Sequence, residues 1–128
     1  MLRPLGVLVS SLYVVSLCSI AAAQTDVEVD PAHNKLEFEN NCVRVVRGNF
    51  GPREKSAGLF DTKSAVIVEL TGSEGWKVSF PDGHSIIAPA THAGHVWWDS
   101  GGGRIQPKNT SDARVEYIVI ELKGKGCK

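Results

Sequence analysis

The sequence predicts an all-β domain, either a sandwich or a barrel, from three observations. Short β-rich runs alternate with turn signals, 13 glycines and 6 prolines are spread over 128 residues, and no long stretch has the 3.6-residue apolar period of a helix. A chain of this length is typical of a single domain. The predicted strands are 42–47, 64–70, 76–80, 84–88, 94–98 and 113–123.

Glycine and proline mark the turns between these strands. Pro81-Asp82-Gly83 is typical of a tight turn, so we expect 76–80 and 84–88 to pair across it as a β-hairpin. Gly101-Gly102-Gly103 indicates a second turn rather than a phosphate-binding loop, because the sequence around it lacks the strand-loop-helix pattern of such loops.

The first 23 residues differ in composition from the rest of the chain. Arg3 is their only charge, 7–20 are apolar or small, and Ala21-Ala22-Ala23 precedes Gln24. A basic start, an apolar stretch and an A-x-A end are typical of a secretory signal peptide. The alternative is a membrane anchor, but a spanning helix needs about 20 apolar residues. We therefore expect cleavage after Ala23 and a secreted or periplasmic protein.

Net charge limits the kinds of partner that the mature chain attracts, and its cysteine content suggests a disulfide. Without Arg3, 13 cations face 14 acids, so there is no basic excess to attract nucleic acid or an anionic membrane. Cys18 lies in the predicted signal peptide, which leaves Cys42 and Cys127. Two such cysteines are expected to form a disulfide in an oxidising compartment, although two free thiols remain the alternative.

The segment from Gly94 to Asn109 places two glycines and an asparagine at a distinctive spacing. It resembles the second motif of the cupins, G-x5-P-x-G-x2-H-x3-N, through Gly94, Gly102 and Asn109, with Ser100 in the proline position and Ile105 in the histidine position. Short fragments in the same order extend the resemblance over roughly 36–123, including Phe80-Pro81-Asp82-Gly83 and Ile120-Glu121-Leu122-Lys123.

The first cupin motif, G-x5-H-x-H-x3-E-x6-G, matches by register rather than by identity. Leu59 and Asp61 fall in the two histidine positions, Ala65 in the glutamate position and Gly72 in that of the closing glycine, while Arg53 stands where the first glycine is expected.

The resemblance implies a small jelly-roll barrel of the RmlC-like cupin type over 35–128, preceded by the signal peptide 1–23 and a polar arm 24–34, and it implies a homodimer. In cupins the three histidines and the glutamate of the motifs hold one divalent metal inside the barrel. Here the four positions hold Leu59, Asp61, Ala65 and Ile105, and one carboxylate cannot hold a divalent ion tightly. We therefore expect no metal and no other cofactor.

A replacement metal site is the weaker alternative. His92 and His95 are three residues apart, and His84 lies on the neighbouring predicted strand. Residues three apart on a strand point to opposite faces, but a turn at Ala93-Gly94 would bring the two imidazoles together. Imidazole suits several divalent transition metals.

The remaining candidates point to a ligand pocket. Trp97 and Trp98 are adjacent, so on a strand one faces the core and the other faces outward. The residues that we expect at a pocket are Asp61, Trp98 and Arg104. If Asp61 is buried among Leu59, Ala65 and Ile105, desolvation raises its pKa.

Three functions compete on these grounds. The leading hypothesis is an exported, metal-free cupin-like module that binds a small ligand or associates with itself. The alternative is a cupin-type isomerase, lyase or oxygenase-like enzyme with a non-standard site around Asp61 and His92/His95. The third is a structural domain whose barrel is filled by side chains such as Leu59, Ala65 and Ile105.

Overall fold

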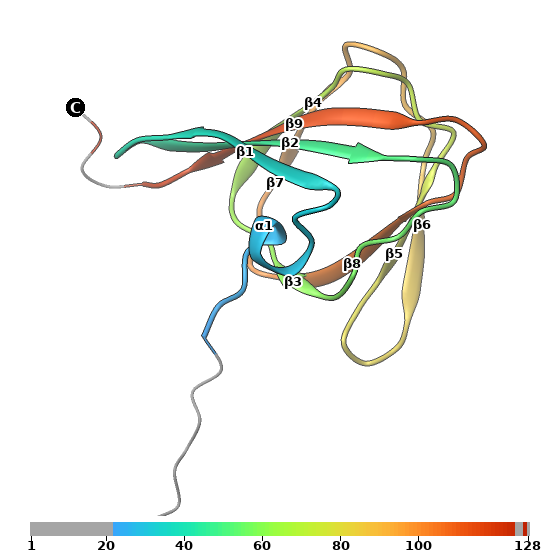
Figure 1. Cartoon of the computed structure of the whole chain (residues 1–128), viewed down its shortest axis with the longest axis horizontal. Helices are drawn as coiled ribbons and strands as arrows, with labels where there is room; N and C mark the ends of the chain where they lie inside the picture. Colours follow the sequence, from blue (N-terminus) through green and yellow to red (C-terminus); the bar gives the residue numbers. More distant parts are fainter. Residues whose placement is uncertain (1–21, 125–126, 128) are drawn as a thin grey trace, which may run out of the picture.

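Two antiparallel sheets face one another and form a small barrel (Figure 1). The computed structural model describes residues 22–124 and residue 127. A five-stranded sheet has the order β1-β2-β9-β4-β7, and a four-stranded sheet has the order β3-β8-β5-β6. The elements are α1 (Asp26–Val29), β1 (Asn34–Glu39), β2 (Val43–Phe50), β3 (Phe60–Asp61), β4 (Ala65–Glu69), β5 (Trp76–Ser79), β6 (Ser85–Ala88), β7 (Val96–Asp99), β8 (Arg104–Asn109) and β9 (Val115–Leu122).

The last strand, β9, lies inside the five-stranded sheet and pairs with β2 on one side and β4 on the other. Side chains alternate between the two faces of a strand, so one row of β9 points into the barrel and the next row points out. The inward row of β9 and its partners on β2 and β4 are Tyr117, Val119, Glu121, Arg44, Val46, Gly48, Ala65, Ile67 and Glu69.

Aromatic rings fill one end of the interior. Phe50 is fully buried, its ring lies edge-on to Trp76 with centroids 5.2 Å apart, and Trp76 lies edge-on to Tyr117 at 5.8 Å. Gly48 makes room for the Tyr117 ring, because a Cβ at this position would collide with that ring. The absence of a side chain at Gly48 therefore lets the Tyr117 ring lie flat across β2.

The fold confirms the all-β prediction and most of the predicted strands. The hairpin of β5 and β6 forms across Pro81-Asp82-Gly83, with Gly83 at φ 89°. Arg53 occupies the position where the first motif expects a glycine. Its φ is 62°, and it is the one non-glycine residue of the described chain in the left-handed region. The backbone there keeps a conformation that suits glycine, at a cost of about 1–2 kcal/mol.

Four elements were not among the predicted strands: α1, β1, β3 and β8. The arm 24–34 contains α1, a single helical turn closed by a capping box in which Thr25 and Glu28 satisfy each other's backbone N–H groups. β8 was missed because it carries Pro107, which cannot donate to a ladder and argues against a strand.

The Cys42–Cys127 disulfide is present, as predicted, and ties the chain's end to the start of β2. The two Cα atoms lie 4.8 Å apart across a sequence separation of 85 residues. A loop of that length corresponds to roughly 4.5 kcal/mol in the chain-entropy model. The predicted signal peptide lies almost entirely outside the described residues. In the part of the chain that the structure describes, no helix is long and apolar enough to cross a membrane.

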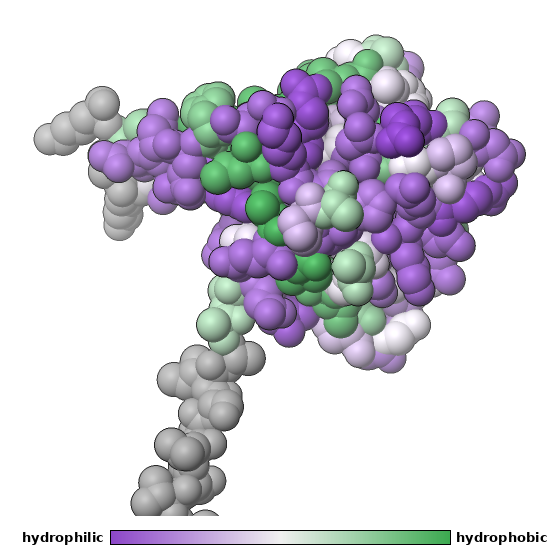
Figure 2. Space-filling model, viewed as in Figure 1, coloured by the Kyte–Doolittle hydropathy of each residue, from purple (hydrophilic) through white to green (hydrophobic). Residues whose placement is uncertain are grey.

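The surface on the side of α1 and β1 is mainly hydrophilic, as Figure 2 shows, with hydrophobic residues gathered around β1 and toward α1. The largest exposed apolar side chains include Ile86 and Ile87 on β6 and Val96 and Trp98 on β7. These two strands are edges of the two sheets.

Candidate functional site

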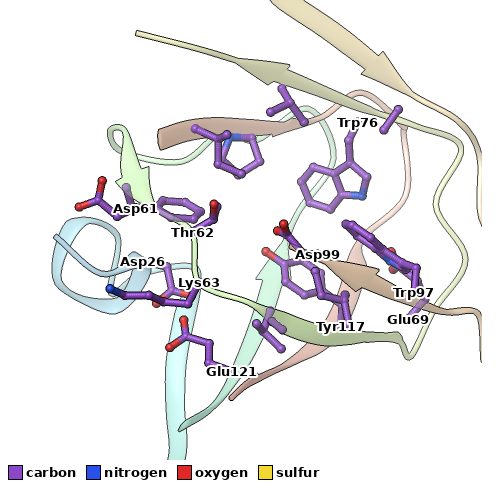
Figure 3. Close-up of a pocket in the computed structure, with 18 residues that line it drawn as sticks. Asp26, Asp61, Thr62, Lys63, Glu69, Trp76, Trp97, Asp99, Tyr117 and Glu121 are labelled. Carbon is purple, nitrogen blue, oxygen red and sulfur yellow. The ribbon is translucent and has the colours of Figure 1, made fainter. Parts of the chain in front are cut away.

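A cavity of about 140 Å³ lies between the two sheets (Figure 3). Its middle is apolar and is walled by Phe60, Ala65, Ile67, Ile105 and Val119. Ala65 is fully buried whereas Lys63 and Trp97 are exposed, so the cavity reaches the surface. Most polar groups gather at its two ends, which we call the charged end (Asp26, Asp61, Lys63, Glu121) and the aromatic end (Glu69, Trp76, Trp97, Tyr117). A fifth carboxylate, that of Asp99 on β7, also lines the cavity.

Asp61 is held at the charged end by partners that keep it ionised. Arg104 Nε donates a hydrogen bond to its Oδ1 at 3.0 Å, and the backbone N–H of Gln24 donates to its Oδ2 at 2.8 Å. The hydrogen bond from Arg104, followed by that from Gln24, lowers the pKa of Asp61. The condition for a raised pKa is not met, because the carboxyl is partly exposed and paired with Arg104 rather than buried among apolar side chains.

Arg44 joins the other two carboxylates of the charged end. Its guanidinium lies 3.1 Å from Asp26 Oδ1 and 3.0 Å from Glu121 Oε1, and its side chain is 10% exposed. Burial raises the pKa of Glu121, and the Arg44 charge opposes part of that rise. One cation is thus shared by two carboxylates, in a compact buried cluster that keeps one negative charge in excess when both carboxylates are ionised.

Glu69 dominates the aromatic end. The residue is 3% exposed, and its Oε2 has no hydrogen-bond partner among the described residues. Burial raises the pKa of this carboxyl, and the side chain of Trp97 opposes the rise only in part. Tyr117 sits opposite Glu69 on β9, and burial raises the pKa of its hydroxyl as well. The sequence analysis did not single out Glu69, because a glutamate near the end of the apolar run 64–70 is typical of a solvent-exposed strand end.

The structure gives the two adjacent tryptophans different places. Trp97 pairs with Ile67 and lines the cavity, whereas Trp98 pairs with Val66 on the outer face of the sheet. Trp98 was expected at the pocket, and Trp97 occupies that position instead. Alternate residues of β7 point into the barrel, and the pairing of β7 with β4 decides which of the two tryptophans does so. The sequence alone does not fix that choice.

The four cupin ligand positions are only partly brought together. Ala65 and Ile105 line the cavity, and so does Asp61, but Leu59 does not. The neighbouring Phe60 lines it instead and pairs with Ile105. Leu59 lies just before β3 and does not take the interior position expected for it, whereas both residues of β3 line the cavity.

Asn109, which closes the second motif, is a structural residue. It is fully buried, and its amide donates to the carbonyls of Gly51 and Ala113 at 3.0 and 2.8 Å. Its carbonyl accepts from the backbone N–H of Ser111 at 3.0 Å. The side chain therefore ties the start of one loop to the turn before β9.

The cupin ligand positions do not fit a divalent metal. Asp61 is their only possible ligand, and it is committed to Arg104. Over the described ranges, no three His, Cys, Asp or Glu side chains lie close enough together to hold an ion. His92 and His95 do meet, with ring centroids 5.4 Å apart, while His84 pairs with Asp82 and stacks on Phe80.

Comparison with known proteins identifies the fold. No protein-family model matches the chain, and no curated protein matches it. A cupin domain from Bordetella pertussis Tohama I is 22% identical with a TM-score of 0.62, over 71% of this chain and 92% of that one. An uncharacterised double-stranded β-helix protein from Klebsiella pneumoniae is 12% identical with a TM-score of 0.53, over 84% and 94% of the two chains. The chain therefore has the cupin fold.

The raised pKa of Glu69 predicts a pH dependence of stability. The folded carboxyl keeps its proton to higher pH than the unfolded one, so the free energy of unfolding falls as pH rises from about 4.5 through the raised pKa. In Glu69→Gln this contribution is absent. The difference in unfolding free energy, wild type minus variant, should therefore decline over that window in urea titrations between about pH 4 and pH 8.

The exposed Glu74 provides the control. Glu74→Gln should give a difference that changes little with pH. A pH-independent difference for Glu69→Gln would show that burial does not perturb this carboxyl.

Proposed function

We propose that the protein binds a small organic ligand inside its barrel. The observation that carries this proposal is the cavity of about 140 Å³, with an apolar middle and a few polar groups at its ends. Small-molecule sites combine these features. An engineered apolar cavity of about 150 Å³ in another protein holds benzene. A ligand with a single ring or a short branched chain is therefore the right size.

Binding is better supported than the enzymatic alternative. That alternative relied on Asp61 as an acid or base, but Arg104 and Gln24 hold it as a carboxylate with a lowered pKa. His92 and His95, its other members, are absent from the cavity lining. The filled-barrel alternative is also weakened, since Ala65 and Ile105 leave open space between the sheets.

A cavity-filling substitution tests the proposal. Ala88 lines the cavity and keeps some exposure, so Ala88→Leu should occupy its volume while the fold persists. With benzyl alcohol as a neutral probe, nuclear magnetic resonance titration should shift the indole N–H signals of Trp76 and Trp97 in the wild type. The same titration of Ala88→Leu should shift them far less.

Ala57→Leu is the matched control, because Ala57 is exposed and lies outside the cavity. It should bind the probe like the wild type. Unchanged signals of Trp76 and Trp97 in the wild type at millimolar probe would contradict the ligand proposal.

Export is a further part of the proposed function. Gln24, the expected first residue after cleavage, exchanges backbone hydrogen bonds with Asp61: its N–H donates to the carboxylate at 2.8 Å, and its carbonyl accepts from the Asp61 N–H at 2.9 Å. Cleavage after Ala23 would place a positively charged amino group beside this carboxylate. The hydrogen bonds between Gln24 and Asp61 could then stay in place, and the new amino group would form an ion pair with the Asp61 carboxylate.

The mass of the exported protein tests this prediction. Expressed with its leader in a host with an oxidising export compartment, the protein should be recovered as Gln24–Lys128, two hydrogen atoms lighter than the reduced chain because of the Cys42–Cys127 disulfide. Cyclisation of Gln24 would remove one further ammonia. A chain that retains its first 23 residues, or that stays in the cytoplasm, would contradict the export proposal.

A second candidate role is self-association through the outer face of the five-stranded sheet. One row of aligned side chains crosses all five strands and is entirely apolar: Phe38, Val45, Ile120, Val66 and Trp98. Phe38 and Trp98, at its two ends, are each 54% exposed. Val45 within the row is buried, so the exposed apolar surface lies mainly at the two ends. Exposed apolar side chains aligned in this way support an interaction surface. A second copy fits it, because an uncharged row meets its own copy without repulsion.

A charge at the end of this row should prevent self-association. Trp98→Glu should shift the protein from dimer to monomer in analytical ultracentrifugation at micromolar concentration, because pairing would bury an unpaired carboxylate. Ile87→Glu is the control, since Ile87 is 70% exposed on the edge of the other sheet. A wild-type monomer throughout the concentration range would rule out this role.

A further inference from the structure

We propose that the ligand of the barrel is a small organic cation, an amine or alkylammonium of about benzene size, with the Glu69 carboxylate as its counter-ion. The proposal rests on the proposed function, because it names the class of ligand for the same cavity. Three independent features of the lining support it.

The first feature is the charge of the cavity wall. Five carboxylates line it, and Lys63 is the only cation in the lining itself. Arg104 compensates Asp61 from outside, and Arg44 is shared between Asp26 and Glu121. With both arginines counted, the ionised site has two more carboxylates than cations. An anionic ligand would be repelled, and a cation would be attracted.

The second feature is the unpaired oxygen of Glu69. Its Oε2 is buried and has no partner among the described residues, in contrast to the carboxylates at the charged end. The side chain of Trp97 offsets only part of the burial of this carboxyl. A buried carboxylate oxygen without a partner is costly, and a charged donor compensates it more than a neutral one does. An ammonium group at this position would supply both the hydrogen bond and the charge.

The third feature is the aromatic surroundings of that carboxylate. Trp76, Trp97 and Tyr117 come from three different strands and converge at the same end of the cavity, with the Trp97 ring in front of Glu69 (Figure 3). The faces of tryptophan and tyrosine rings attract cations. A carboxylate behind aromatic walls recognises an ammonium group together with its hydrocarbon substituents.

The apolar middle of the cavity determines the chemistry of the uncharged part of the ligand. Ile67 and Val119 lie between the two ends and offer contact to hydrocarbon but no hydrogen bond. The ligand is therefore a cation with a compact apolar body, and strongly hydroxylated compounds fit less well.

A comparison of three probes of similar size tests this inference. Benzylamine, benzyl alcohol and benzoate differ mainly in charge, and calorimetric or magnetic resonance titrations give their dissociation constants near pH 7.5. The wild type should bind benzylamine at least about tenfold more tightly than benzyl alcohol, and benzoate most weakly. Glu69→Gln should remove the preference for benzylamine, whereas Glu74→Gln should keep it.

The pH dependence of binding provides a second test. Because burial favours the protonated form of Glu69, benzylamine should bind more tightly as pH rises from about 5 to 7.5, while the affinity for benzyl alcohol changes little. Asp26, Asp61, Lys63, Asp99 and Glu121 also face the site, and burial raises the pKa of Glu121 as well. The pH dependence is therefore assigned to Glu69 only if it is lost in Glu69→Gln.

The outcomes separate the two proposals. If benzyl alcohol binds at the cavity as tightly as benzylamine, the cation inference is overturned while the ligand-binding function stands. If no probe binds, both are overturned. A benzylamine preference that survives in Glu69→Gln would assign the charge recognition to another carboxylate and overturn the role given to Glu69.

Discussion

The position of β9 between β2 and β4 constrains the rest of the barrel. Its register with both neighbours decides that Tyr117, Val119 and Glu121 point inward. A slip of one residue would exchange them for Ile118, Ile120 and Leu122, and would replace the polar groups that β9 gives the cavity with hydrocarbon. At one end of β9, Gly48 on the neighbouring strand leaves space for the inward Tyr117 ring. β9 therefore contributes both to the interior of the cavity and to the apolar row on the outer face.

This constraint places buried charge at both ends of the interior, and the two ends manage it differently. At the charged end, Arg44 donates to Asp26 and Glu121, so each buried carboxylate has a partner. At the aromatic end, Glu69 has a free buried oxygen. A well-partnered buried cluster can be accounted for by folding alone, whereas an unsatisfied group is tolerated where something outside the chain completes it. The contrast within one cavity is the strongest reason to assign function to the Glu69 end.

The sequence was sufficient for the fold but not for the site, and particular residues show why. The second-motif spacing from Gly94 to Asn109 and the Pro81-Asp82-Gly83 turn are local signals, and the structure has a buried hub at Asn109 and a hairpin at that turn. The parity of a short strand depends on long-range pairing instead. β3 has two residues, and neither its length nor its pattern decides whether Leu59 or Phe60 faces inward. The same ambiguity exchanged Trp97 with Trp98.

The cupin ligand positions and Glu69 lie in different parts of one cavity, and this separation bears on how a ligand would sit. Ala65 and Ile105, which occupy two of those positions, give the middle of the cavity only hydrocarbon, while Asp61 is fixed at the charged end by Arg104. Polar recognition is left to the opposite end, behind Trp97. A ligand held there would direct its apolar body along Ile67 and Val119 toward Ala65 and Ile105. The barrel would thus recognise its ligand by charge and aromatic contact rather than by metal coordination.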